Sequence, residues 1–334
     1  MLYFWYSNAS IHWMGCLASS ILTQPDPIQR CEESVMSIHA HPALPEFEYL
    51  RPATLAEASE FLAGHPEEAR PFLGGTDVFV RMRDGFSNPR YLVDVKCLSG
   101  MDTFRFDPHE GLTLGAAVSM NRTAASPEVM AHYPLLAEAC RSVASYQLRT
   151  RATVAGNICN ASPAGDTIGA CLAYDGVLQI HGVDGFCQQS LAGFFLGPGK
   201  TKLRPGDVVT GVRLPPPPKD AAGVYLKLGR NRQGDLSIVG VSVLGYTDPA
   251  APSGYRFRIT LASVAPVPLV AGEAEAYLSA NQVTAEAICK AADLAAAACS
   301  PIDDVRGSAL YRREMARNLT RKGLEQVWHS LNGA

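Results

Sequence analysis

The sequence lacks several features that would assign it to a common class at once. No apolar run reaches the roughly 18 residues of a membrane-spanning helix. The nine cysteines form no CxxC or CxC pair, which argues against a tight zinc or iron–sulfur site, and their odd number argues against a disulfide framework. The net charge of -3 gives no support to a nucleic-acid partner. We therefore expect reduced thiols, a cytoplasmic location, no bound metal and no membrane span.

Two nucleotide-binding motifs are also missing. No GxxxxGK[ST] occurs, which excludes a P-loop NTPase, and no GxGxxG follows a predicted strand, which excludes a Rossmann domain. The eight histidines stand in ordinary contexts, typical of surface or core positions. Because no nucleophile–base pair stands out either, we predict no catalytic side chain.

Two glycine-containing segments are present instead, LGGTDV at 73–78 and TVAGN at 153–157, about 80 residues apart. Glycine lets a backbone approach a ligand without a Cβ in the way, and successive N–H groups in such turns form concavities that suit phosphate oxygens. Thr76 and Thr153 each add a hydroxyl, and the first segment leads into a predicted helix start. Tight turns in strand-rich proteins use the same residues, but two such segments in one domain favour a diphosphate held between two subdomains.

Local patterns predict short helices and strands in the first half. The capping box Thr54-Leu55-Ala56-Glu57 predicts a helix that ends at Gly64. The stretch TVAGNICNASPAGDT at 153–167 has neither a helical nor a strand period, and we predict a loop there. Strands are predicted at 71–73, 91–95, 104–106, 112–114, 177–181, 186–189, 208–214, 224–228, 238–244 and 257–264, and helices at 78–84, 135–143, 284–299 and 308–331.

Four consecutive prolines at 215–218 predict a stiff, extended linker. We place a domain boundary there, with one domain at 41–218 and a second at 219–330. We predict an α+β fold for the second domain, with an antiparallel sheet and C-terminal helices. Residues 1–40 have no Lys or Arg before Arg30. We interpret them as an N-terminal extension, either a loose tail or the product of a start site placed too far upstream.

Four motifs, in this order, carry a family resemblance: LGGTDV at 73–78, TVAGNICNASPAGDT at 153–167, FFLGPGKTKL at 194–203 and PIDDVRGSALYRREM at 301–315. Together they resemble the FAD-binding medium subunit of the molybdenum hydroxylases, the group of xanthine dehydrogenase and carbon monoxide dehydrogenase. The resemblance covers roughly residues 45 to 330, and the second and fourth motifs are the specific ones.

The resemblance implies an α+β fold with FAD as the cofactor. A two-lobed FAD-binding domain of the vanillyl-alcohol-oxidase (PCMH) type would precede a smaller CO dehydrogenase flavoprotein-like domain. The two glycine segments would hold the diphosphate, and the acid that follows them would bond the ribityl or ring region of the flavin. The implied FAD contacts are Phe72, Leu73, Gly74, Gly75, Thr76, Asp77, Val78, Thr153, Val154, Ala155, Gly156, Asn157, Asp166, Val209 and Lys227.

The implied function is electron transfer within a heterotrimer. A large partner subunit would hydroxylate the substrate at a molybdenum cofactor, and a small partner would pass electrons through [2Fe–2S] clusters to FAD. NAD or another acceptor would then take them. Two alternatives stay open: a free-standing FAD oxidase of the same fold, and an assembly module that has lost FAD.

Two positions depart from the family pattern. Ala155 stands where relatives usually have the first of two adjacent glycines, but a methyl group is small and we still expect FAD to bind. Pro198 stands where relatives often carry a tyrosine near the flavin ring. The sequence therefore does not show which residue would cover that face of the ring. The cysteines lack the spacing of the cluster-binding insertion in one branch of the family, so we predict no iron–sulfur centre in this chain.

Overall fold

The computed structural model describes residues 43–231 and 234–333. The prediction of an N-terminal extension at 1–40 lies outside these residues. No helix in the described ranges combines the length and the apolar character of a membrane span.

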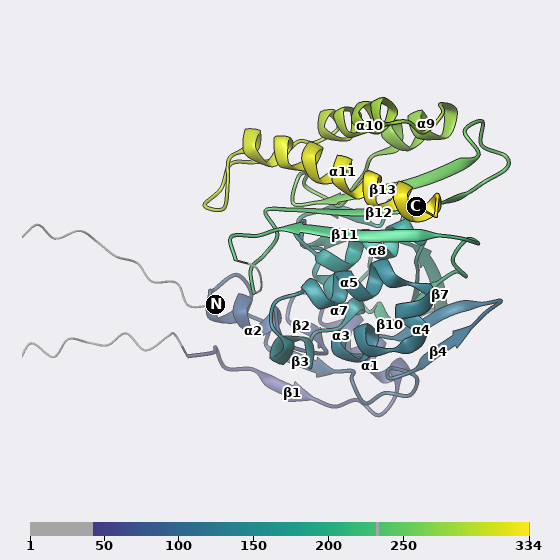
Figure 1. Ribbon diagram of the computed structural model, residues 1–334. Coiled ribbons are helices and arrows are strands. Elements are labelled where there is room, and N and C mark those ends of the chain that lie inside the picture. Colours follow the sequence, from purple (N-terminus) through teal and green to yellow (C-terminus); the bar gives the residue numbers. More distant parts are fainter. Residues whose placement is uncertain (1–42, 232–233, 334) are drawn as a thin grey trace, which may run out of the picture. The chain divides into compact units, whose positions relative to one another are not determined.

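A small parallel sheet opens the described chain, with strand order β1–β3–β2. Helix α1 connects β1 to β2, and α2 connects β2 to β3 (Figure 1). The capping box is confirmed, because the Thr54 hydroxyl accepts a hydrogen bond from the Glu57 N–H at 3.1 Å. The elements are β1 (Glu48–Leu50), α1 (Leu55–Gly64), β2 (Ala69–Phe72), α2 (Val78–Arg83) and β3 (Tyr91–Asp94).

A five-stranded antiparallel sheet follows, with order β4–β5–β10–β6–β7. The central strand shifts register between Val209 and Gly211 where it pairs with β6. The proline run after this strand is anchored, since the Tyr133 hydroxyl donates to Pro215 O at 2.9 Å. The strands are β4 (Phe104–Asp107), β5 (Gly111–Gly115), β6 (Val177–Gly182), β7 (Gly185–Ser190) and β10 (Val208–Leu214), with a separate hairpin of β8 (Phe195–Gly197) and β9 (Lys200–Thr201).

Six helices lie between these strands in the sequence, and they correct the loop predicted at 153–167. That stretch forms α7 and the first turn of α8. The Thr153 hydroxyl caps α7 by accepting from the Gly156 N–H at 2.9 Å. The helices are α3 (Met120–Ala125), α4 (Pro127–His132), α5 (Pro134–Ser142), α6 (Tyr146–Arg149), α7 (Val154–Asn160) and α8 (Asp166–Ala173).

The C-terminal part is a four-stranded antiparallel sheet covered on one face by three helices (Figure 1). Helices α5 and α8 lie against its other face. Strand β12 is therefore buried on both faces: Val241 and Val243 join the core beneath the C-terminal helices, whereas Leu244 joins the core of the N-terminal part. The elements are β11 (Ala222–Leu228), β12 (Val239–Thr247), β13 (Tyr255–Ala262), β14 (Leu269–Val270), α9 (Gly272–Ala280), α10 (Ala285–Ala297) and α11 (Ala309–Leu331).

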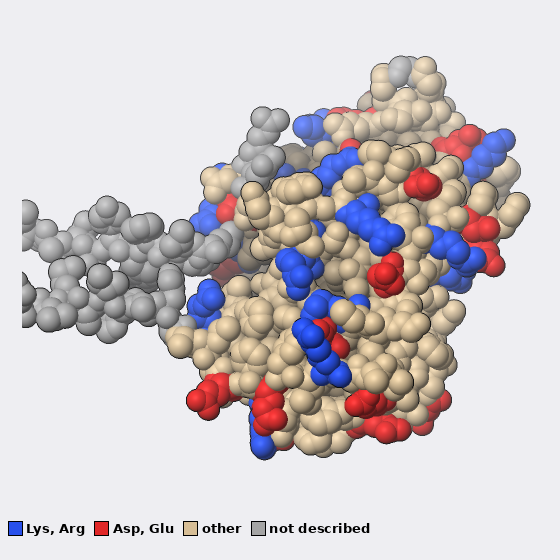
Figure 2. Space-filling model, turned by 90° about the horizontal axis from the view of Figure 1, so that it is seen from below, with Lys and Arg blue, Asp and Glu red and all other residues tan. Residues whose placement is uncertain are grey.

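The surface carries charges of both signs. On the face shown in Figure 2, Lys and Arg side chains are interspersed with Asp and Glu, and acidic side chains also gather along the lower edge. This face shows no broad basic area of the kind that tracks a phosphate backbone.

Candidate cofactor site

The first glycine segment turns the chain from β2 into α2. Gly75 has φ +74, a left-handed conformation that favours glycine. A Cβ on Gly74 would overlap Arg151 O and lie 2.8 Å from the Arg151 carbonyl carbon. The absence of a side chain at Gly74 therefore lets this segment pack directly on the backbone that leads into α7.

The second segment presents the start of α7. The backbone bridge between Ser119 and Thr153 and the hydrogen bond from Met120 N to Ala152 O at 2.8 Å hold it in place. Thr153 takes an extended conformation and caps the helix. The Asn157 carboxamide oxygen then accepts from the Thr167 hydroxyl at 2.7 Å, which ties α7 to α8.

A cavity of about 460 Å³ lies between the two segments. This volume falls within the range of small-molecule sites in proteins. The bulged strand β10 contributes to its wall. The predicted site residues that line the cavity are Leu73, Gly74, Gly75, Thr76, Asp77, Val78, Thr153, Gly156, Asn157 and Val209.

The other predicted residues do not line the cavity. Phe72 is a buried ring that supports Gly75, because a Cβ there would lie 2.7 Å from it. Val154 and Ala155 are buried in the core of the N-terminal part. The Ala155 methyl group therefore does not narrow the cavity, and the departure at this position gives no support to an assembly module that has lost FAD.

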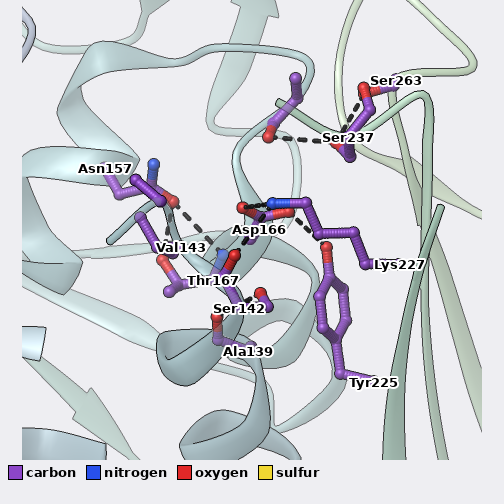
Figure 3. A network of polar contacts seen from close by, with 12 residues as sticks. Ala139, Ser142, Val143, Asn157, Asp166, Thr167, Tyr225, Lys227, Ser237 and Ser263 are labelled. Carbon is purple, nitrogen blue, oxygen red and sulfur yellow. Dashed lines mark hydrogen bonds and ion pairs between the residues drawn. The ribbon is translucent and has the colours of Figure 1, made fainter. Parts of the chain in front are cut away.

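Asp166 and Lys227 meet each other behind the cavity wall (Figure 3). The Lys227 ammonium donates to the Asp166 carboxylate at 2.7 Å and to Ser142 O at 3.0 Å. The Tyr225 hydroxyl donates to the other carboxylate oxygen at 2.6 Å. Burial raises the pKa of Asp166, while the Lys227 charge and both hydrogen bonds oppose that rise. The ion pair joins α8 to β11.

This network reaches the cavity through neighbouring residues. Asn157 lines the cavity and bonds Thr167, the residue after Asp166. Ser142, which accepts from Lys227, precedes Val143 in the cavity wall. A change in the ion pair is therefore expected to move the wall on two sides.

Sequence reasoning missed several side chains of the cavity. Those with the clearest chemical character are Arg81, Phe86, Leu148, Asn160, Cys159 and Val208. Only Val208 could have been predicted from the sequence, because it precedes Val209 in the same predicted strand. Burial raises the pKa of the Cys159 thiol to about 12, so this side chain is a neutral thiol near pH 7.

The motif PIDDVRGSALYRREM builds a buried arginine cluster. Arg312 is 1% exposed, and its guanidinium donates to Ile238 O at 2.8 Å, to Ser263 O at 3.1 Å and to Asp304 at 2.5 Å. Arg306 donates to the second oxygen of Asp304 at 2.6 Å. The cluster fixes the start of α11 against β12 and β13, so we assign this motif to the fold of the C-terminal part.

This cluster predicts a loss of stability in acid. Burial raises the pKa of Asp304, but hydrogen bonds from Arg306 and Arg312 outweigh it and lower that pKa to about 2. An unfolded-chain aspartate has a pKa near 3.9. The stabilising contribution is therefore complete above about pH 4 and is lost as the pH falls through about 2.

Urea unfolding of the Asp304→Asn variant tests this. We expect the variant to be less stable than the parent protein near pH 7, and the difference to shrink as the pH falls towards about 2. Asp293→Asn is the control, because Asp293 pairs with Arg317 where both side chains are nearly half exposed. A stability difference between the parent protein and Asp304→Asn that stays constant with pH would contradict the lowered pKa of Asp304.

Comparisons with known proteins indicate which cofactor this site binds. Residues 45–217 match the family described as the FAD binding domain in molybdopterin dehydrogenase. Residues 224–327 match the CO dehydrogenase flavoprotein C-terminal domain. The carbon monoxide dehydrogenase medium chain of Hydrogenophaga pseudoflava is 32% identical, over 85% of this chain and 98% of that protein. The chain belongs to the FAD-binding subunits of the molybdenum hydroxylases.

Further relatives of this FAD-binding subunit agree. The putative xanthine dehydrogenase FAD-binding subunit of Escherichia coli (strain K12) is 29% identical over 85% of this chain and 97% of its own. The structure of carbon monoxide dehydrogenase from Hydrogenophaga pseudoflava superimposes with a TM-score of 0.82 and 31% identity, covering 86% of this chain and 99% of that one. The predicted family, fold class, oxidoreductase role and FAD cofactor are confirmed. The individual FAD contacts stay a prediction.

The cavity fits the diphosphate of FAD. Within the described ranges, the backbone N–H groups of Gly74, Gly75 and Thr76 have no protein acceptor. Buried or half-buried N–H groups rarely stay unpaired, and N–H groups that open on a cavity are suited to phosphate oxygens. We expected glycine at positions 74 and 75 to let the backbone approach a ligand. In the structure these glycines allow close packing within the protein, since a Cβ on Gly74 would meet Arg151 and a Cβ on Gly75 would meet Phe72.

Proposed function

We propose that this FAD-binding subunit transfers electrons within a molybdenum-containing hydroxylase or dehydrogenase. Electrons would enter from [2Fe–2S] clusters on a small partner subunit and leave to NAD or another acceptor. The support is the cavity between the two glycine segments, together with relatives that are named medium chains or FAD-binding subunits. FAD, when bound, can accept electrons singly and deliver them in pairs.

The chain's own residues bind and orient the cofactor in this proposal. The N–H groups of Gly74, Gly75 and Thr76 would hold the diphosphate, with the start of α7 on the opposite side. Val209 would contact the cofactor from β10. Asp166 and Lys227, which lie behind the cavity wall, would act on the cofactor through the wall near Asn157 that their ion pair supports. No side chain is assigned a proton-transfer step.

The proposed partners are a large subunit with the molybdenum cofactor and a small [2Fe–2S] subunit. The support is the word "medium" in the names of relatives that this chain covers almost completely. Co-expression of the three chains, followed by affinity capture of this one, tests the proposal. We expect both partners to be captured with it, and we place the complex in the cytoplasm.

The cofactor is tested on the purified chain. We expect flavin absorption at about 450 nm, a property of the cofactor, and release of FAD rather than FMN on denaturation. A colourless protein that does not bind added FAD would contradict the proposal. Oxidation of a small alcohol by the isolated chain would favour a free-standing oxidase instead.

A further inference from the structure

The loop between α7 and α8, residues 161–165, connects the cofactor cavity to the C-terminal part of the molecule. On the cavity side, Cys159 and Asn160 at the end of α7 line the wall. The Ala161 carbonyl accepts a hydrogen bond from the Gly199 N–H at 3.0 Å, and Gly199 lines the same cavity. The position of this loop therefore determines where this part of the cavity wall lies.

The loop is a compact turn that is closed by its own hydrogen bonds. The Gly165 N–H donates to Ser162 O at 2.9 Å, and the Ala164 N–H donates to the Ser162 hydroxyl at 3.2 Å. Ala161, Ala164 and Gly165 are buried. Because closely packed atoms surround such a turn, a displacement at one of its ends is passed on to the other.

Two buried serines of the C-terminal part hold the other side of the loop. The Ser263 N–H donates to Pro163 O at 2.7 Å, and the Ser237 hydroxyl donates to Ala164 O at 3.4 Å. The two serine hydroxyl oxygens are 2.8 Å apart, and the Ser263 hydroxyl also donates to Ser237 O at 2.9 Å. Figure 3 shows this serine pair in the same view as Asp166, the first residue after the loop.

Ser263 is held in a backbone conformation that serine rarely adopts. Its φ of +67 lies in the left-handed region, and a residue with a side chain stays there only when its surroundings fix it. Strand β13 ends at Ala262, and the turn at Ser263 directs the N–H of this residue to Pro163 O. The groups that fix Ser263 therefore also hold the loop.

The arginine cluster of the motif at 301–315 supplies those groups. The Arg312 guanidinium donates to Ser263 O at 3.1 Å, and the Arg306 guanidinium donates to Ser237 O at 3.3 Å. Both arginines donate to the carboxylate of Asp304, which holds the two guanidinium groups in a fixed relation. Each arginine thus binds the carbonyl oxygen of one serine, directly behind the contact of that serine with the loop.

We propose that Arg306 and Arg312 are positioning residues for the cofactor site. They fix the two serines, the serines fix the loop, and the loop fixes the adjoining cavity wall. A site keeps its geometry only when the residues around it are held by such outer contacts. The motifs at 153–167, 194–203 and 301–315 are then one connected unit. The inference rests on the proposed function and deepens it, because it gives the last motif a part in retaining FAD.

Binding constants of the flavin-free full-length chain for FAD test this inference. The double variant Ser237→Ala with Ser263→Ala loses both hydroxyl groups that support the loop. We expect its FAD affinity to fall about 2- to 30-fold, the range for changes within a network that couples two sites. Arg312→Met should lower the affinity in the same direction. The serine variant decides the test if Arg312→Met does not fold.

Hydrogen exchange provides a readout that a purely structural role would not change. Coupling between two sites is reciprocal, so FAD in the cavity must in turn fix the loop. We expect FAD to increase the protection of the Ser263 N–H, which is bonded to Pro163 O. The Asp248 N–H, bonded to Gly254 O at 2.9 Å between β12 and β13, lies off this path, and FAD should leave its protection unchanged.

Val327→Ala is the matched control, because Val327 is buried in the C-terminal core near the other end of α11. It should lower the free energy of unfolding and still bind FAD as the parent protein does. Parent-like FAD affinity in the serine variant overturns the inference, as does a Ser263 N–H whose protection FAD does not change. An equal loss of affinity in Val327→Ala also overturns it. Failure of the parent protein to bind FAD overturns the proposed function, and the inference with it.

Discussion

A Gly74→Ala variant should lose FAD and unfold more easily. The added Cβ would overlap Arg151 O and approach its carbonyl carbon to 2.8 Å. Both contacts are to backbone, so no side chain can rotate away, and the two segments must separate. Overpacking of this kind costs about 1–3 kcal/mol, occasionally more. Separation would also widen the cavity where the diphosphate is expected.

The variant is measured by FAD content per chain and by urea unfolding. Gly64→Ala provides the control: Gly64 ends α1, and a Cβ there meets nothing within 4 Å. Its stability should stay the same or rise slightly, since alanine favours the helix more than glycine does. Full FAD content in Gly74→Ala would show that the first segment does not hold the diphosphate.

Asp166→Ala should also destabilise the protein strongly. The side chain of Lys227 is only 14% exposed and would lose the carboxylate with which it is paired. Removing one member of a buried ion pair costs about 3–5 kcal/mol. The Tyr225 hydroxyl would lose its acceptor as well. FAD binding should weaken too, because the ion pair supports the wall beside Asn157.

A double-mutant cycle with Lys227→Met isolates the pair. We expect Asp166→Ala combined with Lys227→Met to be less destabilised than the sum of the single variants, since no unpaired charge is left in the double variant. Asp184→Ala is the control, because the Asp184 side chain is 81% exposed in its pair with Arg204 and its loss should change stability little. Additive effects at Asp166 and Lys227 would contradict the coupling.

Signals between close neighbours in the chain were predicted well. The Thr54 capping box, the hairpin of β6 and β7 and the amphipathic α5 lie where their patterns placed them. Such patterns depend on a few consecutive residues, because a cap or a two-residue turn satisfies its own backbone groups. The four family motifs also identified FAD, because together they carry the resemblance to a family that binds this cofactor.

The stretch 153–167 was predicted wrongly as a loop for a physical reason. Its two glycines and two asparagines have low helix propensity, and α7 spans only Val154–Asn160. The helix forms because the Thr153 hydroxyl caps it and because Val154, Ala155 and Ile158 are buried in the core. Burial against distant strands is a tertiary contribution, and it outweighs local propensity.

The sequence by itself determined the family, the cofactor and most of the segments that surround the cavity. Only the tertiary structure decided that Ala155 turns into the core, that Asp166 meets Lys227 from the other domain, and that Arg81 and Phe86 stand at the rim. These facts depend on which side of a helix faces a neighbour distant in the chain. A motif fixes the order of residues, but packing alone fixes the direction in which each side chain points.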